Sequence, residues 1–420
     1  MGEGNQVKIV HAADIHLDSP LMGLSRLGDE AAKALRGATR EALVNLVKLV
    51  QDEDARLLVI AGDLYDGDWN DYATGAFFVR QMDELNDVGI HVVIASGNHD
   101  AESQITRALR LPPNVTMLPV DRPGSVVLED LGIVVHGQGY PTRDLAENLV
   151  AAYPGRIPSL VNVGVLHTAV TGAEGHALYA PCSPQDLQML KYDYFALGHV
   201  HQRGAVAEGE HPAWFSGNLQ GRHARETGPK GALVVDFEPG RPAQVDFRAL
   251  DVARWEQVMV DVTDLSDTDA ILDAIEASLC AKVGAAEGRR TVARIRMVGT
   301  SRLAARLQDT EWLDAEVDRI QDRVGAVVET VKVDVVAPKA PDPEAALLRA
   351  AMAKTADRLR ETPVEVTELL KTLDREIRDI AKGASTSSAD SLDLTDEGVA
   401  LRLLENAQSA LDARLAGLEH

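Results

Sequence analysis

Potential metal ligands recur along this chain directly after runs of apolar residues. The stretch "VKIVHAADIH" ends in Asp14 and His16, and "FALGHVH" ends in His199 and His201. In a strand, residues i and i+2 point to the same side of the sheet, so each pair would leave its strand together. Unpaired carboxylates and imidazoles are costly to bury, which favours a shared chemical role over packing. In chain order, the full set of these residues is Asp14, His16, Asp63, Asn98, His99, His167, His199 and His201.

The oxygen and nitrogen donors of this set suit two divalent cations. Two such ions, about 3.5 to 4 Å apart, can hold the attacking and the leaving oxygen of a phosphoester. They require a bridging carboxylate with oxygen and imidazole ligands on either side, and Asp63 lies midway in the set. His99 is left to act on the substrate as a general acid or to stabilise charge on the phosphoryl group. The predicted ligands are Asp14, His16 and His201 for one ion and Asn98, His167 and His199 for the other.

Short β-branched runs alternate with helical patterns in the first part of the chain, an order typical of an α/β fold. Strands are predicted at 7–13, 56–63 and 90–98, with helices at 41–51 and 73–86 between them. Functional groups collect at the strand ends of such a sheet, because the sheet holds the loops there rigidly. Five further runs are expected to form a second, mixed sheet packed on the first, at 131–138, 161–168, 194–200, 213–217 and 231–237.

Three regions are predicted, a catalytic domain over 1–249, a small capping domain over 250–338 and a helical region over 339–420. The pattern of the cap predicts a β-α-β-α-β unit. The proline-rich segment "APKAPDPE" predicts a linker or a sharp corner. Beyond it, two apolar stripes at helical spacing either pack on their own domain or bind a partner. They comprise Val366, Leu369 or Leu370, Leu373, Ile377 and Ile380, then, after a loop at 383–393, Leu401, Leu403, Leu404, Leu411 and Leu415.

The net charge of -23 argues against a protein whose whole surface grips polyanions. Any contact with nucleic acid must therefore be local. No apolar run approaches the roughly 20 residues of a membrane span, and strand-like residues follow the N-terminus too soon for a signal peptide. We therefore expect a cytoplasmic protein with no membrane partner. Two basic clusters would mark a DNA track if they face the cations, and are otherwise solvated loops: Arg222, His223, Arg225 and Lys230, then Arg289 and Arg290.

The ordered motifs D-x-H, G-D, G-N-H-D, a single H and G-H-x-H resemble those of the calcineurin-like metallophosphoesterases over residues 8–237. With "HAADIHLDSPL", "GDLYDGDW" and "FSGNLQGRHARETGPKGALVVDF", the chain looks like the bacterial DNA-repair branch of SbcD-type and double-strand-break repair nucleases. The resemblance implies a four-layer α-β-β-α sandwich with a small α+β capping domain and C-terminal helices. It also implies exonuclease or endonuclease hydrolysis of DNA by two divalent ions, Mn²⁺ first, with Mg²⁺, Fe²⁺ or Zn²⁺ as alternatives. In that family, the ligand and acid roles fall on the residues already named.

A large SMC-like coiled-coil ATPase is the partner that the resemblance implies, with a second copy of this chain as another candidate. Some relatives carry a histidine associated with handling DNA ends at the position of Asp66, so Asp66 joins Arg222, His223 and Arg225 as a candidate substrate contact. Two other functions stay open. The same ligands could serve a small-molecule phosphodiesterase or phosphatase, which suits the acidic surface better. The chain could also be a scaffold with vestigial hydrolysis, although the intact ligand set argues against that.

Overall fold

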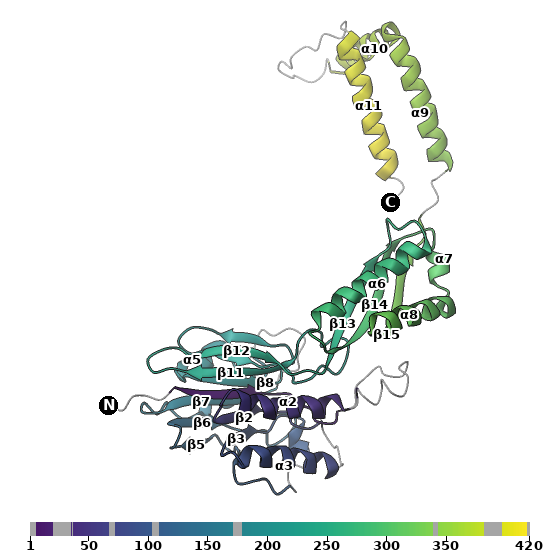
Figure 1. The fold of residues 1–420 in the computed structure, drawn as a ribbon. Helices are drawn as coiled ribbons and strands as arrows, with labels where there is room; N and C mark the ends of the chain where they lie inside the picture. The colour runs from purple at the N-terminus through teal and green to yellow at the C-terminus, as the bar shows by residue number, and fades with distance from the viewer. Residues whose placement is uncertain are drawn as a thin grey trace. The chain divides into compact units, whose positions relative to one another are not determined.

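The computed structural model of the chain describes residues 6–19, 35, 37–66, 72–102, 109–170, 179–338, 343–381 and 397–417. These residues belong to two compact units, Met1–Ala337 and Pro338–His420 (Figure 1). The boundary between the units falls in the proline-rich segment. The loop expected at 383–393 lies outside the described residues. The division of the first unit into catalytic domain and cap at residue 250 stays a prediction.

The first sheet of the larger unit has six strands in the order β12-β11-β1-β2-β3-β4. β1 to β4 run parallel, so their carboxyl ends meet at one edge of the sheet. α2 (Ala38–Asp52) and α3 (Tyr72–Asn86) connect the first three of them, as predicted. The strands are β1 (Val7–Ala12), β2 (Leu57–Ala61), β3 (His91–Ala95), β4 (Val115–Met117), β11 (Gly231–Phe237) and β12 (Gln244–Ala249).

The second sheet also has six strands, in the order β5-β6-β7-β8-β10-β9. β6, β7, β8 and β10 are parallel, and the two edge strands are antiparallel to their neighbours. The short helices of this part are η2 (Asp100–Glu102), η3 (Leu149–Ala152) and α5 (Pro184–Met189). The strands are β5 (Gly124–Leu128), β6 (Ile133–Gly137), β7 (Val161–His167), β8 (Tyr194–Gly198), β9 (Gly204–Ala207) and β10 (Ala213–Phe215).

The prediction that residues 231–237 join the second sheet is wrong. β11 pairs antiparallel with β1 in the first sheet, with Val235 opposite Ile9. Its apolar residues face both ways, because Val234 packs on the outer, helix-covered core and Val235 on the core between the sheets. A run that is apolar on both faces needs cover on both sides, but its pattern does not say which of two buried sheets it enters.

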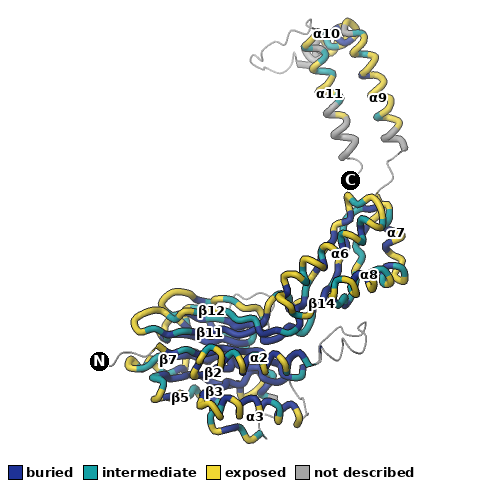
Figure 2. Tube along the Cα trace, viewed as in Figure 1, coloured by how far each residue is buried: buried dark blue, intermediate teal, exposed yellow. Residues whose placement is uncertain are grey.

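Two stacked sheets with helices on their outer faces form four layers. The apolar face of α2, with Leu43, Leu46 and Val50 at helical spacing, packs on the first sheet. Valines from the inner faces of the two sheets, such as Val59 and Val165, fill the core between them. A third core lies between the second sheet and its short helices. Figure 2 shows the buried strands, and the predicted α-β-β-α order is confirmed.

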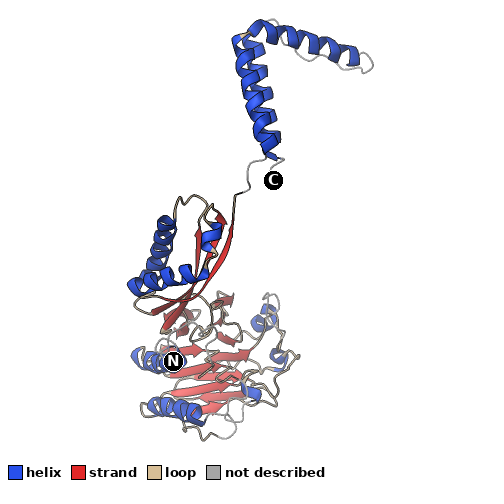
Figure 3. Cartoon of the chain, turned by 90° about the vertical axis from the view of Figure 1, so that its right-hand side faces the viewer, coloured by secondary structure: helices blue, strands red, loops and turns tan. Residues whose placement is uncertain are grey.

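The cap is a β-α-β-α-β unit of three parallel strands in the order β13-β14-β15. Figure 3 shows its helices on one face of the small sheet. The side chain of Asp267 accepts from the backbone N–H of Ala270 and so caps the first of these helices. The elements are β13 (Ala253–Asp261), α6 (Thr268–Ala285), β14 (Arg290–Thr300), α7 (Ala304–Leu307), α8 (Thr310–Val324) and β15 (Val327–Val336).

The smaller unit consists of α9 (Pro343–Glu361), α10 (Pro363–Ala381) and α11 (Glu397–Gly417), which pack on one another. The apolar stripe predicted on α10 is divided. Val366 is buried within the unit, whereas Leu369 and Leu373 are 55% and 44% exposed. In the part of the chain that the structure describes, no helix is both long and apolar enough to cross a membrane.

Candidate metal centre

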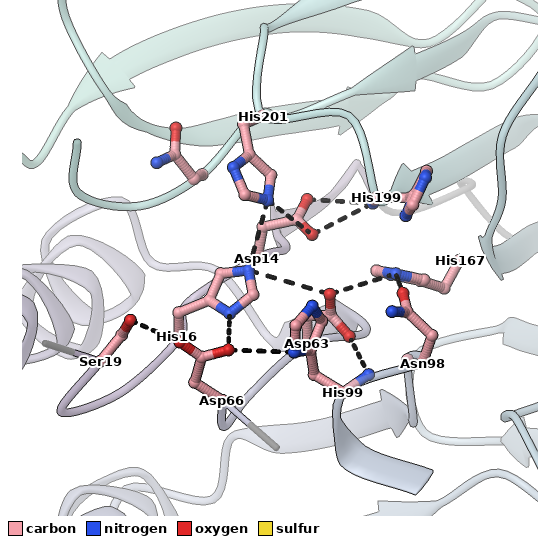
Figure 4. Close-up of polar contacts among 12 residues, drawn as sticks. Asp14, His16, Ser19, Asp63, Asp66, Asn98, His99, His167, His199 and His201 are labelled. Atoms are coloured by element: carbon pink, nitrogen blue, oxygen red, sulfur yellow. Dashed lines mark hydrogen bonds and ion pairs between the residues drawn. The ribbon is translucent and has the colours of Figure 1, made fainter. Parts of the chain in front are cut away.

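The predicted ligands lie at or just beyond the carboxyl ends of five strands. β1, β2 and β3 of the first sheet and β7 and β8 of the second sheet end on the same side of the sandwich. Figure 4 shows the side chains from both sheets turned toward one another. Asp14 and Asp63 are almost fully buried, as are His16, Asn98 and His167. Strand ends that are far apart in the sequence therefore build one polar centre inside an apolar sandwich.

One half of this centre consists of Asp14, His16 and His201, whose donor atoms lie within 4.8 Å of one another. The Nε2 atoms of His16 and His201 face each other at 3.3 Å. His201 Nε2 is 3.8 Å from Asp14 Oδ1, and His16 Nε2 is 3.8 Å from Asp63 Oδ2. Two imidazole nitrogens pointing at each other beside two carboxylates fit a divalent cation with nitrogen and oxygen ligands.

The other half groups Asp14, Asp63 and His167, again within 4.8 Å. His167 Nε2 lies 3.4 Å from Asp63 Oδ2 and 2.9 Å from Asn98 Oδ1. Asp63 thus stands between His16 on one side and His167 on the other, where a bridging ligand is required. The donor set fits two cations, and the assignment of each ligand stays a prediction.

His199 takes a different place from the other predicted ligands. Its backbone N–H donates to both carboxylate oxygens of Asp14, at 3.1 and 3.0 Å. Its ring stands edge-on to that of His167, with centroids 5.2 Å apart. The residue also lines a cavity that opens beside the two donor groups. It is absent from the close donor groups that the described residues form. The structure therefore brings His199 to the centre without placing a ring nitrogen among the converging atoms.

The backbone of the ligand loops is unusual. Asp14, His16, Asp63 and His199 have positive φ angles of 51°, 45°, 52° and 98°. Non-glycine residues rarely adopt this left-handed conformation, which costs of order 1 to 3 kcal/mol and clusters at functional sites. Gly62, with φ of 90°, lies so close to the ring of His167 that a Cβ atom on it would be 2.3 Å from His167 Nδ1. The loops are thus held in strained conformations that direct the side chains inward.

Asp100 joins two of these loops. Its buried carboxylate accepts backbone N–H groups from Leu64, Tyr65 and Gly97 at 2.9 to 3.1 Å. Burial raises the pKa of Asp100 to about 6. The contacts fix the loop that carries Asp63 against the loop that carries Asn98 and His99. Asp100 therefore stabilises the centre without belonging to it.

His99 projects into the cavity beside the metal centre and is held by two carboxylates. Its Nδ1 atom lies 2.9 Å from Asp66 Oδ1, and its backbone N–H donates to Asp63 Oδ1 at 3.0 Å. The hydrogen bond to Asp66 raises the pKa of His99 above its ordinary value. Asp66 in turn accepts a hydrogen bond from Ser19 Oγ at 2.6 Å. This arrangement favours a protonated His99.

The protonation of His167 follows from its neighbours. Its Nδ1 faces the backbone oxygen of Ala61 at 3.0 Å, and its Nε2 faces Asn98 and Asp63. Burial alone would lower the pKa of His167, but the charge of Asp63 raises it to about 9. An imidazole must be neutral to bind a cation, so a cation at Nε2 would displace this proton.

A cavity of about 400 Å³ opens beside the two groups. Arg222 and Lys230 are mostly buried in its wall, whereas Arg225 is exposed. Arg289, from the second predicted basic cluster, instead donates to the backbone oxygens of Ala249 and Asp251. The residues that line the cavity are Asp63, His99, His199, His201, Gln202, Arg222, His223, Arg225, Glu226 and Lys230.

Sequence reasoning missed Ser19 and Glu226. Ser19 contacts Asp66, and Glu226 Oε1 lies 2.6 Å from His201 Nδ1. Glu226 stands within the basic stretch "RHARETGPK", and a single acid among basic residues is the only signal of it in the sequence. Both residues lie in loops, where no periodicity marks the position of a side chain.

Two segments of the larger unit match families of known proteins. Residues 7–203 match the model of the calcineurin-like phosphoesterase family, and residues 255–336 match that of the middle domain of metallophosphoesterase YhaO. The uncharacterized metallophosphoesterase YhaO of Bacillus subtilis is 34% identical over 271 residues, which cover 64% of this chain and 66% of that protein. The predicted resemblance to the calcineurin-like metallophosphoesterases is confirmed.

More distant relatives are described as nucleases or repair proteins. The DNA double-strand break repair protein Mre11 of Methanopyrus kandleri is 25% identical, covering 61% of this chain and 60% of that protein. The SbcD component of the SbcCD nuclease of Bacillus subtilis is 23% identical, covering 60% of this chain and 70% of that protein. The matches thus span less than two thirds of the YhaO and Mre11 relatives.

Proposed function

We propose, from the premise that residues 7–203 form a calcineurin-like metallophosphoesterase domain, that the protein hydrolyses phosphodiester bonds of DNA with two divalent cations. The observation that carries this proposal is the cavity in which the metal centre, His99 and a basic wall meet. Membership of this domain family supports a hydrolase. The substrate and the identity of the cations belong to the proposal.

The residues of the site divide the work of hydrolysis. Bound divalent cations would neutralise charge on the phosphodiester and activate water. Protonated His99 would give its proton to the leaving oxygen, because its ring lines the cavity and its Nδ1 is engaged by Asp66. Nε2 of His99 is then the atom from which the proton departs. Asp66 keeps the ring oriented and holds the proton on it.

The basic wall supports a substrate that carries more than one phosphate. Arg222, His223, Arg225 and Lys230 line the cavity although the whole chain carries a net charge of -23. Arg222 already forms ion pairs with two carboxylates, since its guanidinium lies 3.6 Å from Asp66 and 3.5 Å from Glu226. Exposed Arg225 is the better candidate for a phosphate outside the cleaved bond. Such contacts position a nucleic acid without reading its sequence.

The named relatives support the rest of the proposal. Mre11 is a double-strand break repair protein, and the SbcD component is part of a nuclease. We extend these descriptions to DNA as substrate, Mn²⁺ as the cation and a coiled-coil ATPase as partner. A protein that acts on the chromosome of a bacterium would work in the cytoplasm.

A small-molecule phosphodiesterase or phosphatase is the second candidate. Two observations favour it. The overall charge is acidic, and Asp66 stands behind His99 at the position where some relatives carry a histidine associated with handling DNA ends. A nucleotide or a phosphorylated metabolite needs only the central part of the cavity. The ligand set would be the same for both substrates.

Activity measurements separate these candidates. The purified protein is incubated with Mn²⁺ and, in parallel, single-stranded DNA, double-stranded DNA, bis-p-nitrophenyl phosphate and p-nitrophenyl phosphate. Cleavage of DNA that stops on chelation and in His99→Ala supports the nuclease. Hydrolysis of the small esters alone, with DNA intact both with and without the candidate ATPase, contradicts it and favours the second candidate.

A further inference from the structure

Glu226 is a buried carboxylate in the loop that leads from β10 to β11, and it is 7% exposed. Its Oε1 lies 2.6 Å from His201 Nδ1. Its Oε2 accepts hydrogen bonds from Asn218 Nδ2 at 2.9 Å and from the backbone N–H of Arg222 at 2.7 Å. Donors on three sides therefore fix both oxygens of this carboxylate.

The contact determines which nitrogen of His201 is free. An ionised carboxylate can only accept, so Nδ1 carries the proton that is donated to Glu226. Arg222 Nη2 lies 3.4 Å from the same Nδ1, but it is itself only a donor and the distance is longer. Nε2 is left with its lone pair directed toward His16 and Asp14. The ring is thus held in the orientation of a metal ligand.

The cap anchors the loop that carries Glu226. Fully buried Trp255 of β13 donates from Nε1 to the backbone oxygen of Gly221 at 2.9 Å. Its own backbone oxygen accepts the N–H of Gly228 at 3.2 Å. Gln257 Nε2 donates to the backbone oxygen of Ala224 at 3.1 Å. The backbone on both sides of Glu226 is therefore tied to a strand of the cap.

Among the described residues, neither of the other histidines in the two donor groups, His16 and His167, has a carboxylate within hydrogen-bond distance of its Nδ1. His167 Nδ1 faces the backbone oxygen of Ala61 at 3.0 Å, a neutral acceptor. His16 Nδ1 is 3.8 Å from Asp66 Oδ1, beyond hydrogen-bond distance, and Asp66 is engaged by His99. A carboxylate behind a metal-bound histidine orients the ring and raises its basicity more than a carbonyl does. His201 is thus supported differently from His16 and His167.

We propose that Glu226 is a positioning residue that fixes the orientation and tautomer of His201 and thereby strengthens only the cation site formed by Asp14, His16 and His201. The proposal concerns binding of cations and holds whichever phosphoester is the substrate. Glutamine cannot replace Glu226, because its single amide oxygen cannot accept from donors on both sides. Aspartate keeps the charge but is shorter by one methylene group.

Calorimetric titration of chelator-treated protein with Mn²⁺ tests the proposal without an activity assay. We expect two equivalents in the unchanged protein and, in Glu226→Gln, one equivalent weakened about 10- to 100-fold with the other unaltered. Glu238→Gln is the matched control, since Glu238 pairs with Arg241 on the surface. This control should bind both equivalents as the unchanged protein does.

A second pair of titrations identifies the affected site. Adding Glu226→Gln to His201→Ala should weaken binding no further, whereas adding it to His167→Ala should weaken the remaining equivalent. Unchanged binding of both equivalents by Glu226→Gln overturns the proposal. So does equal weakening of both together with a lower melting temperature of the metal-free protein, which indicates a merely structural role. If Glu226→Gln does not fold, Glu226→Asp carries the same expectation.

Discussion

Asp66 lies behind His99, with its Oδ1 2.9 Å from Nδ1 of the imidazole, although 33 positions separate the two residues. Ser19 Oγ holds the other oxygen of Asp66 at 2.6 Å. The carboxylate therefore orients the ring and stabilises its protonated form. The pKa of Asp66 is below the ordinary range because of the hydrogen bond from His99.

Asp66→Asn should move the alkaline limb of the pH–rate profile to lower pH. A general acid works while it is protonated, and loss of the Asp66 charge lowers the pKa of His99. The measurement is kcat/KM against pH for a dinucleotide, whose leaving oxygen needs a proton. Asp264→Asn, at an exposed position in the cap, is the control. An unshifted limb in Asp66→Asn would contradict the role of Asp66.

His99→Ala should retain both cations and lose about 10²-fold or more in kcat on a dinucleotide. The loss should be smaller on bis-p-nitrophenyl phosphate, because p-nitrophenolate leaves without a proton. Elemental analysis of the same sample gives the metal content. If metal content falls in proportion to rate, His99 is a ligand and not the acid.

Asp63→Ala should cost binding of both cations, because Asp63 Oδ2 faces His16 on one side and His167 on the other. Phosphodiester hydrolysis should then be abolished. Equilibrium dialysis with Mn²⁺ measures the stoichiometry. Full activity in Asp63→Ala would be incompatible with two cations sharing this ligand.

Gly62→Ala should lower the melting temperature and weaken metal binding together. The added Cβ would lie 2.3 Å from His167 Nδ1, at a φ of 90° that already disfavours alanine. Gly209→Ala is a matched control, because Gly209 has φ of 87° and nothing lies within 4 Å of its added Cβ. The control should lose of order 1 kcal/mol of stability and bind Mn²⁺ normally. Equal effects of the two variants on metal binding would refute the close-approach explanation.

Deletion of residues 342–420 should leave hydrolysis of a small diester nearly intact, since the metal centre and the cavity lie in the other compact unit. Association with the proposed ATPase and processing of DNA should weaken. Without the deletion, Leu369→Asp and Leu373→Asp should act similarly, because both side chains are exposed. A truncated protein that still binds the ATPase at full strength would move the interface to the larger unit.

Many of the regular elements could be predicted because each has a local signature, whereas the strands β4, β5, β9 and β12 were not predicted. Strand-like apolar runs that alternate with helical patterns predicted β1, β2, β3 and the helices between them. The polar residues at the ends of these runs are the predicted ligands. The sheet that receives β11 could not be predicted, since its residues are apolar on both faces. The choice depends on pairing with β1, which is a long-range property.

The residues that contact the predicted ligands and His99 from behind could not be predicted from local sequence patterns. Asp66 is predicted as a substrate contact, and its contact with His99 in the structure had no signal in the sequence. Glu226 was missed although it lies 2.6 Å from a predicted ligand. Both come from loops, and loops carry no period that would say which way a side chain points.

The left-handed backbone at Asp14, His16, Asp63 and His199 means that selection for folding and selection for activity favour different residues there. Glycine adopts this conformation freely, so a library screened only for folding should enrich glycine at these four positions. A library screened for phosphoester hydrolysis should remove it at Asp14, His16 and Asp63, since glycine offers no donor atom in place of theirs. The positions where the two screens disagree would outline the metal centre without any inspection of the fold. Random drift under relaxed selection should therefore erase the ligands before it erases the sandwich.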